Sequence, residues 1–283
     1  MGVVRFIVAA GVAAGATVGT RRVLDALADD GERWTRTNHR GEPISLLEGP
    51  AVAAGLLAGT LAAGGPAPGA TVLGTASAAV FGVIDDLAED TTVRTKGLRG
   101  HLGALAQGRV TTGALKILGI PATALVAAAV GTERRGGALG HLVDVGVNGA
   151  LIAGTANLLN LFDLRPGRAL KAGVVASLPL VLGPTGAGTG AVLGAAVAAA
   201  PGDLGERDML GDGGANALGA LVGSQIAFGA PRAVRLAALA AVVGLTLTSE
   251  RVSFSKVIAE TPWLSKVDLW GRRQAPPAPA PKS

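Results

Sequence analysis

Cysteine and tyrosine are both absent from the 283 residues, and aromatic residues make up only 3% of the chain. Without cysteine the chain has no disulfides and no thiolate metal ligands. The three histidines, His39, His101 and His141, are scattered, and no pair has the spacing of a zinc site. These absences exclude disulfide-rich proteins and proteins with thiolate metal sites.

Charge is scarce as well. Charged residues are 16% of the chain, against roughly 25% in soluble domains, whereas 49% is hydrophobic and the mean hydropathy is +0.47. A soluble protein of this length would need more surface charge, so lipid contact explains the composition best. The net charge of +5 is small. We therefore expect an integral membrane protein with no nucleic-acid partner.

Apolar segments recur along the whole chain and predict an all-α bundle of about nine transmembrane helices. Several are nearer 15 than the roughly 20 residues that cross a ~30 Å hydrocarbon core. The sixth and seventh are the shortest, and a re-entrant pair is the alternative there. A signal peptide is the alternative for the first, disfavoured by the eight apolar segments that follow. The expected spans are 2–20, 46–64, 68–84, 110–130, 141–162, 169–183, 187–201, 213–229 and 232–248.

The basic residues are unevenly distributed between the two sets of loops. With the N-terminus outside, 19 of the 25 Lys and Arg fall on one side, in loops 21–45, 85–109, 163–171 and 202–212 and in the tail from 249. The positive-inside rule places that side in the cytoplasm. All the acids except Glu133 and Asp144 fall there too. We therefore expect a multi-pass membrane protein with its chemistry and its C-terminus on the cytoplasmic face.

Small residues and prolines divide the chain further. Residues 1–271 are expected to form a single membrane domain, and the proline-rich residues 272–283 are expected to form a disordered tail.

Glycines spaced by four place small faces on helices, which permits close packing and is consistent with a homodimer. These glycines are Gly11, Gly15 and Gly19, Gly55 and Gly59, and Gly219 and Gly223.

Two adjacent carboxylates, Asp85 and Asp86, follow the third span in the stretch FGVIDDLAED. Carboxylates at a membrane boundary need water, cations or a metal, and Mg²⁺ prefers a few carboxylates plus substrate phosphates. A solvated helix end is the alternative. The next loop, TKGLRGH, carries Lys96, Arg99 and His101 among glycines. That loop suits phosphate binding by charge and backbone N–H groups. The alternative is that its positive charge serves only to keep the loop on the cytoplasmic side of the membrane.

The fifth span ends in NLLNLFDLRPGR. Asn157 and Asn160 lie about 60° apart on a helix, and Asp163 ends the run on the same side. Buried amides need partners, either on neighbouring helices or in a ligand at the cytoplasmic mouth. Arg165 and Arg168 then supply guanidiniums for the bilayer surface or for a phosphate.

Two further polar stretches stand at the starts of spans. Asp212 precedes a glycine-rich helix and reads as an N-terminal cap or as a carboxylate facing a metal or an amine. Asn38, His39 and Arg40 precede a glycine and proline turn before the second span.

Taken in order, these motifs resemble one family. The series is N-H-R-G-x-P, G-x-x-D-D with K-G-L-R-G-H, N-x-x-N-x-x-D, and L-G-D-x-G-A-N-x-L-G. It is similar to that of the polyprenyl-phosphate N-acetylhexosamine-1-phosphate transferases of glycosyltransferase family 4, which include the phospho-N-acetylmuramoyl-pentapeptide transferase. The resemblance runs from about residue 38 to 223.

The resemblance implies a Mg²⁺-dependent enzyme that moves a sugar-1-phosphate from a UDP-sugar to a polyprenyl phosphate and releases UMP, in cell-envelope glycan synthesis. It implies that Asp85, Asp86 and Asp163 are catalytic and that Asp86, Asp163 and Asp212 hold the metal. The residues implied in substrate binding are Asn38, Arg40, Lys96, Arg99, His101, Asn157, Asn160, Arg165 and Arg168.

The chain also departs from the family pattern. The family continues D-G-x-D-G after the asparagines, whereas Leu164 and Pro166 here replace a glycine and a second carboxylate of the metal site. The histidine-rich loop of the pentapeptide transferases has no counterpart. These departures favour the alternative of a non-catalytic relative that binds polyprenyl phosphate or a lipid-linked sugar in envelope assembly.

The charge asymmetry makes a direct prediction about topology. A reporter fused after Ser283 is expected to be cytoplasmic, because the C-terminal tail lies on the side rich in Lys and Arg. Enzymatic reporters active on only one side of the membrane measure this. A periplasmic signal from that fusion would contradict the nine-span topology.

Overall fold

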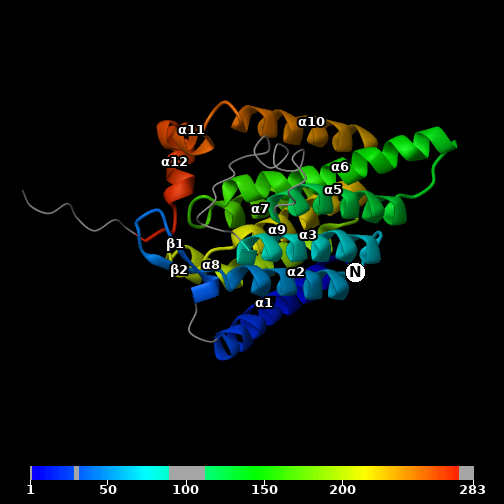
Figure 1. Ribbon diagram of the computed structural model, residues 1–283. Helices are drawn as coiled ribbons and strands as arrows, with labels where there is room; N and C mark the ends of the chain where they lie inside the picture. Colours follow the sequence, from blue (N-terminus) through cyan, green and yellow to red (C-terminus); the bar gives the residue numbers. More distant parts are fainter. Residues whose placement is uncertain (1, 29–31, 89–111, 274–283) are drawn as a thin grey trace, which may run out of the picture.

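The computed structural model describes residues 2–28, 32–88 and 112–273. The chain is all-α apart from one small hairpin, as the composition predicts, and eleven α-helices lie within these ranges (Figure 1). Each of the nine predicted segments coincides with a helix. These helices are α1 (Gly2–Leu27), α2 (Glu48–Ala63), α3 (Pro68–Ala88), α5 (Thr112–Gly131), α6 (Ala138–Phe162), α7 (Arg168–Ser177), α8 (Gly186–Asp203), α9 (Gly211–Gly229) and α10 (Arg232–Ser249).

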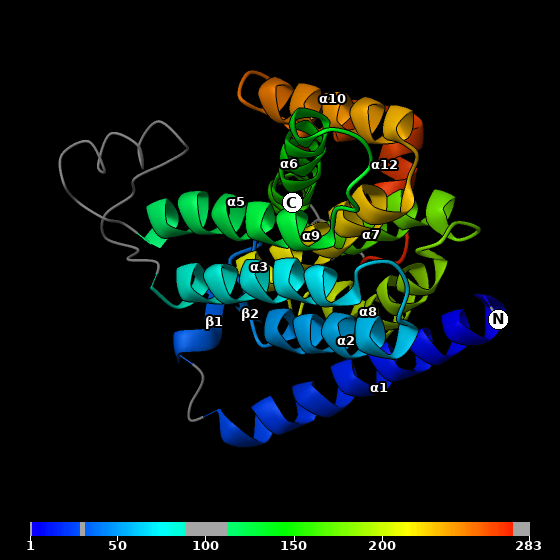
Figure 2. The ribbon, with the colours of Figure 1, turned by 90° about the vertical axis from the view of Figure 1, so that its right-hand side faces the viewer.

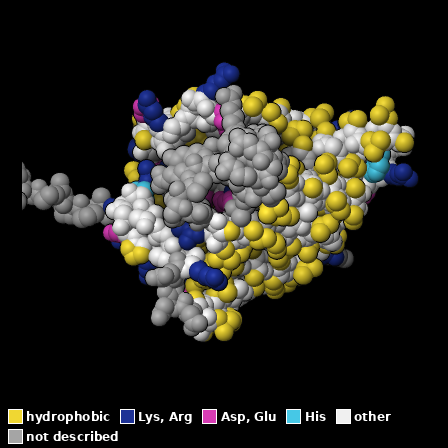
Figure 3. Space-filling model, viewed as in Figure 1, with side chains coloured by type: hydrophobic (Ala, Val, Ile, Leu, Met, Phe, Trp, Pro, Cys, Tyr) yellow, Lys and Arg dark blue, Asp and Glu magenta, His cyan; other side chains and the backbone are white. Residues whose placement is uncertain are grey.

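Four of these helices, α1, α3, α6 and α10, are long and apolar enough to cross a membrane. Apolar side chains cover the middle of the face in Figure 3, and Lys and Arg gather towards the left end. The apolar belt and the charged end fit the membrane character that the composition predicts. The number of helices that cross stays a prediction.

The sixth predicted span differs from a simple helix. α7 has ten residues, which rise only about 15 Å. It continues through a short 3₁₀ helix, η2 (Leu178–Leu180), which rises faster per residue. Val181 and Leu182 then line one pocket together with Val3 of α1 and Ala63 of α2. The segment therefore reaches the far end of the bundle by changing helix type, and it does not turn back halfway.

Helix α9 forms the centre of the bundle. It packs against α2, α3, α6 and α7, and fifteen of its nineteen residues are buried. Views from two directions show it enclosed by the other helices (Figures 1 and 2). Gln225 of α9 has partners on α7 and near the start of α8: its amide oxygen accepts a 2.8 Å bond from Ser177, and its amide nitrogen donates to the backbone carbonyl of Thr185. Such bonds hold helices together where water is excluded.

Close backbone approach explains part of the glycine spacing. A side chain at Gly219 or Gly223 would collide with the backbone of α6, and one at Gly55 would collide with α1. Those faces pack as predicted. The prediction is wrong for the glycines of α1 within the described part of the chain, because no atom there lies within 4 Å of a Cβ built at any of the three: Gly11, Gly15 and Gly19. That open face is compatible with the predicted homodimer, which stays a prediction.

The end of the bundle near α9's first residue carries structure that the apolar pattern did not predict. A 3₁₀ turn, η1 (Glu32–Trp34), leads into an antiparallel hairpin of β1 (Thr35–Thr37) and β2 (Pro43–Ser45), with Arg36 opposite Ile44. Two short helices, α11 (Phe254–Glu260) and α12 (Pro262–Leu269), follow α10. Residues 274–283 of the predicted tail lie outside the described ranges.

The opposite end carries a second polar cluster. Arg235 of α10 donates a 2.8 Å bond to the amide oxygen of buried Asn148 on α6. Its guanidinium lies 3.6 Å from Asp144, and that of Arg232 lies 3.4 Å from the same carboxylate. Asp144 lies in the second turn of α6. The cluster ties the peripheral helix α10 to α6.

The contact between α3 and α9 makes a prediction about stability. A Cβ at Gly82 would meet the backbone carbonyl of Asp212 and Gly213, so Gly82→Ala must push the two helices apart. We expect a loss of about 1–3 kcal/mol. That corresponds to a fall in Tm of about 2–10 °C in detergent for a chain of this size.

The matched control is Gly244→Ala on α10, where a Cβ meets no described atom within 4 Å. Alanine has the higher helix propensity, so this variant should keep or slightly raise the Tm. Equal melting of the two variants would contradict the close contact between α3 and α9.

Candidate functional site

Three of the predicted site carboxylates meet at one end of the bundle, where α3 and α6 end and α9 begins. Asp86 comes from the last turn of α3, Asp163 follows α6 directly, and Asp212 is in the first turn of α9. These segments are far apart in the sequence. The fold therefore brings the D-D, N-x-x-N-x-x-D and G-D-x-G motifs together.

Asp86 caps the start of α9. Its two carboxylate oxygens accept hydrogen bonds from the backbone N–H groups of Asp212 (2.9 Å) and Gly213 (2.8 Å). The first N–H groups of a helix have no partner within it, and negative charge is favourable at that end. Arg36 of the hairpin also donates to the backbone carbonyl of Asp86. Asp86 thus joins α3, α9 and the hairpin.

Lys116, on the second turn of α5, lies between two of the acids. Its ammonium is 2.6 Å from the carboxylate of Asp85 and forms a second ion pair with Asp212. All three side chains are largely buried. A single ammonium therefore neutralises parts of two carboxylates that the resemblance assigns to catalysis and to the metal.

Asp163 is the least neutralised of the predicted acids. It is 7% exposed, and one of its carboxylate oxygens has no hydrogen-bond partner within the described ranges. Burial, followed by the carboxylates of Asp203, Asp212 and Asp86, raises the pKa of Asp163 well above its usual value, and a backbone hydrogen bond from Gly211 opposes that rise. Asp163 therefore needs a cation or a proton.

Two more acids, Glu48 and Asp203, extend the cluster and were not predicted. Both carboxylate oxygens of Glu48, which is 3% exposed, lack a described hydrogen-bond partner. Asp203 accepts a 2.8 Å bond from the backbone N–H of Gly167, and its second oxygen lacks a described partner. Glu48 and Asp203 begin and end helices that read as ordinary span boundaries, so no motif distinguished them.

The donor chemistry of Asp163 and Asp212 fits a Mg²⁺ ion. Mg²⁺ usually takes one or two protein carboxylates together with substrate phosphates, and Asp163 has an unpartnered oxygen. No group of three or more His, Asp or Glu side chains in the described ranges is arranged to hold a metal ion. Asp86, the third predicted ligand, uses both oxygens for α9. Asp163 and Asp212 are therefore the predicted ligands that remain for an ion, and metal binding stays a prediction.

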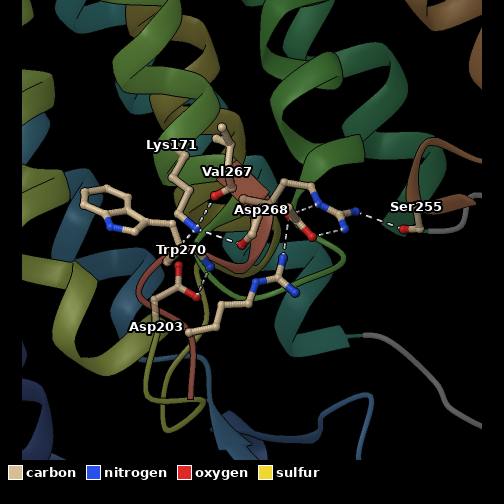
Figure 4. Close-up of polar contacts among 9 residues, drawn as sticks. Lys171, Asp203, Ser255, Val267, Asp268 and Trp270 are labelled. Atoms are coloured by element: carbon tan, nitrogen blue, oxygen red, sulfur yellow. Dashed lines mark hydrogen bonds and ion pairs between the residues drawn. The ribbon is translucent and has the colours of Figure 1, made fainter. Parts of the chain in front are cut away.

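The predicted phosphate partner Arg168 is bound within the protein. Its guanidinium forms two bonds to the carboxylate of Asp268 on α12, at 2.9 and 3.1 Å, and one of 2.9 Å to the hydroxyl of Ser255 on α11 (Figure 4). Burial opposes ionisation of Asp268, but hydrogen bonds and charge from Arg168 lower its pKa. Phosphate binding by Arg168 stays a prediction that would require release from Asp268.

Lys171, one turn after Arg168, holds the end of α12. Its ammonium donates to the backbone carbonyls of Val267 (3.0 Å), Asp268 (2.8 Å) and Trp270 (2.6 Å) (Figure 4). A cation at a helix C-terminus satisfies carbonyls that lack partners within the helix. The basic turn after α6 therefore anchors the C-terminal helices.

The asparagines of the motif and Arg165 differ in burial. Asn157 is exposed on α6, whereas Asn160 and Arg165 are half-buried. Both asparagines lie in α6 and keep the helical spacing that places them about 60° apart. Nucleotide contacts by the asparagines, and phosphate contacts by Arg165, stay predictions.

Two other predicted binding residues organise the hairpin. The side-chain oxygen of Asn38 accepts bonds from the backbone N–H groups of Arg40 (2.8 Å) and Glu42 (2.9 Å). Arg40 lies 2.7 Å from the buried carboxylate of Glu206. Both therefore have structural partners. Lys96, Arg99 and His101 lie outside the described residues.

Lys116 is the main site residue that the sequence did not reveal. It falls within an apolar span, and only the fold brings it to the two acids. A lone ionisable residue in such a segment is by itself a signal of function.

Comparison with known proteins finds no family model and no curated protein that matches the chain. The family resemblance therefore rests on the motifs and stays a prediction.

The cap on α9 predicts different effects of two neighbouring substitutions. Asp86→Asn replaces one acceptor oxygen with an amide that faces a backbone N–H. Leaving that buried N–H unsatisfied costs about 1–3 kcal/mol, which lowers the Tm by about 2–10 °C. Asp85→Asn keeps the cap and leaves Lys116 paired with Asp212, so it should lower the Tm less. A smaller loss for Asp86→Asn, measured by thermal unfolding in detergent, would contradict the cap.

Proposed function

We propose that this protein transfers a sugar-1-phosphate from a UDP-sugar to a polyprenyl phosphate at the cytoplasmic face of a bacterial membrane, releasing UMP. The observation that supports this most is the meeting of Asp86, Asp163 and Asp212 with Lys116 at one end of the bundle. Four helices or helix ends contribute one group each. The three acids belong to the motifs that carry the resemblance.

The position of the cluster suits the two substrates. A nucleotide sugar is water-soluble, whereas a polyprenyl phosphate presents its phosphate at the membrane surface. The cluster lies at the end of apolar helices, close to the hairpin and to Arg168. In the proposed nine-span topology this end is cytoplasmic, where both substrates can reach it.

The reaction requires chiefly positioning and neutralisation of phosphate charge. An oxygen of the lipid phosphate bonds to the phosphorus that carries the sugar, the bond from that phosphorus to the bridging oxygen breaks, and UMP leaves. Mg²⁺, when bound, would neutralise the diphosphate oxygens. The surplus of buried carboxylate oxygens on Glu48, Asp163 and Asp203 gives such a cation a favourable environment.

The chain's own residues take separate roles in this proposal. Asp163 and Asp212 would hold the cation. Lys116 would bind phosphate oxygens as a point charge, once a cation replaces it at Asp212. Asp86 positions the start of α9 and hence Asp212. Asp85 keeps Lys116 near the phosphates through its 2.6 Å ion pair.

A specific observation favours a second candidate, a non-catalytic binder of polyprenyl phosphate or a lipid-linked sugar. Lys116 forms ion pairs with both Asp85 and Asp212. Where the family has a glycine and a second carboxylate, Leu164 is exposed and Pro166 is buried. An ammonium held between two carboxylates is suited to an anionic headgroup even if no transfer follows.

One assay separates the two candidates. The purified protein is mixed with Mg²⁺, a polyprenyl phosphate and a panel of UDP-sugars, and UMP is measured. The transferase is expected to release UMP with one donor. Asp163→Asn, which removes a charge that would hold the cation, should slow release by about 100-fold or more.

The control is Glu133→Gln at the opposite end of the bundle, where the carboxylate is exposed, and it should keep the activity of the unmodified protein. Saturable binding of the lipid phosphate without UMP from any donor would reject the transferase and support the binder. Absence of both release and binding would reject both candidates.

A further inference from the structure

The C-terminal helices α11 and α12 have two distinct sides. The side against the bundle carries Phe254, which stacks on Phe162 of α6 with ring centroids 5.1 Å apart. It also carries Asp268, whose carboxylate pairs with Arg168 and, at 2.6 Å, with Arg272. This side is firmly attached to the protein.

The outward side of α12 is apolar and aromatic. Trp263, Val267 and Trp270 are spaced i, i+4 and i+7, which places them in one row, and their exposed fractions are 66%, 51% and 74%. The chain has only three tryptophans and no tyrosine. Of the three, Trp263 therefore lies on α12 and Trp270 directly follows its last residue, and both are exposed.

The two charged side chains of α12 lie on different sides of the helix. Its only acid, Asp268, faces inward and is paired with Arg168. Its only base, Lys266, is exposed beside the aromatic row. The outward side is thus apolar with one positive charge, and a lysine can bury its stem while its ammonium reaches phosphate groups.

The length of α10 places this side at a membrane boundary. Its eighteen residues rise about 27 Å, close to the thickness of the ~30 Å hydrocarbon core. Its apolar face is open, since only Val242 is buried among its residues. After four connecting residues α11 begins, and α12 runs across that end of the bundle (Figure 1). α12 therefore lies where α10 would leave the lipid.

We infer that α12 lies in the headgroup region of the cytoplasmic leaflet, with Trp263, Val267 and Trp270 inserted at the boundary of the acyl chains. Tryptophan is enriched at such interfaces, and short amphipathic helices with basic residues bind there. The partner of this surface is the lipid bilayer. The inference requires the chain to be in a membrane and does not depend on catalysis.

Tryptophan quenching tests the inference in the full-length chain. The protein is placed in nanodiscs of phosphatidylcholine and phosphatidylglycerol whose acyl chains carry bromine near the glycerol end. Trp34→Phe leaves Trp263 and Trp270 as reporters, and the double variant Trp263→Phe with Trp270→Phe leaves half-buried Trp34 as the matched control. We expect the bromolipids to quench the first pair about twofold or more beyond the control.

Two results of this experiment would overturn the inference. Strong quenching of Trp263 and Trp270 by acrylamide in water, with little quenching by bromolipid, would overturn the inference, because the row would then face solvent. Protection from both quenchers would also overturn it, because another protein or a second copy would then cover the row. A further variant, Val267→Glu, places a charge in the row and should reduce bromolipid quenching while leaving Trp34 unchanged.

Discussion

The two hydrogen bonds from the backbone of Asp212 and Gly213 to the carboxylate of Asp86 hold the buried start of α9. Helices surround α9 on several sides, so water cannot readily satisfy its first N–H groups, and an unsatisfied buried N–H is unfavourable. A carboxylate in that position brings a negative charge into a crowded interior. Lys116 of α5 supplies a positive charge that neutralises part of the negative charge gathered there.

This arrangement links stability and chemistry at the same residues. Asp86 is at once the acid that the resemblance assigns to catalysis and the cap of the central helix. Asp85 and Asp212 share Lys116, and one oxygen of Asp163 has no partner among the described residues. The cluster is therefore balanced in part by protein groups and in part open to a cation, which is the condition that a phosphate-transfer site or a phosphate-binding site requires.

The sequence predicted the parts that depend on local pattern. Apolar runs located nine helices, and polar breaks such as Asp85–Asp86 and Asp163 located the end where the acids meet, because burial and charge leave a direct mark on composition. Long-range pairing leaves no such mark. Lys116 looked like a residue within a span, and Arg168 looked like a free phosphate partner, although Asp268, 100 residues later, binds it. Which acids pair with Lys116 and Arg168 is decided by the fold and not by the local sequence pattern.

The cap on α9 also has a consequence for biosynthesis. Asp86 and its partner Asp212 are 126 residues apart in the chain. At synthesis rates of about 5–20 residues per second, α9 emerges from the ribosome roughly 6–25 s after α3. During that interval the carboxylate of Asp86 must remain protonated, hydrated or covered by another protein, because its permanent partner does not yet exist. The assembly of the central helix is thus timed by the translation of the segments between α3 and α9.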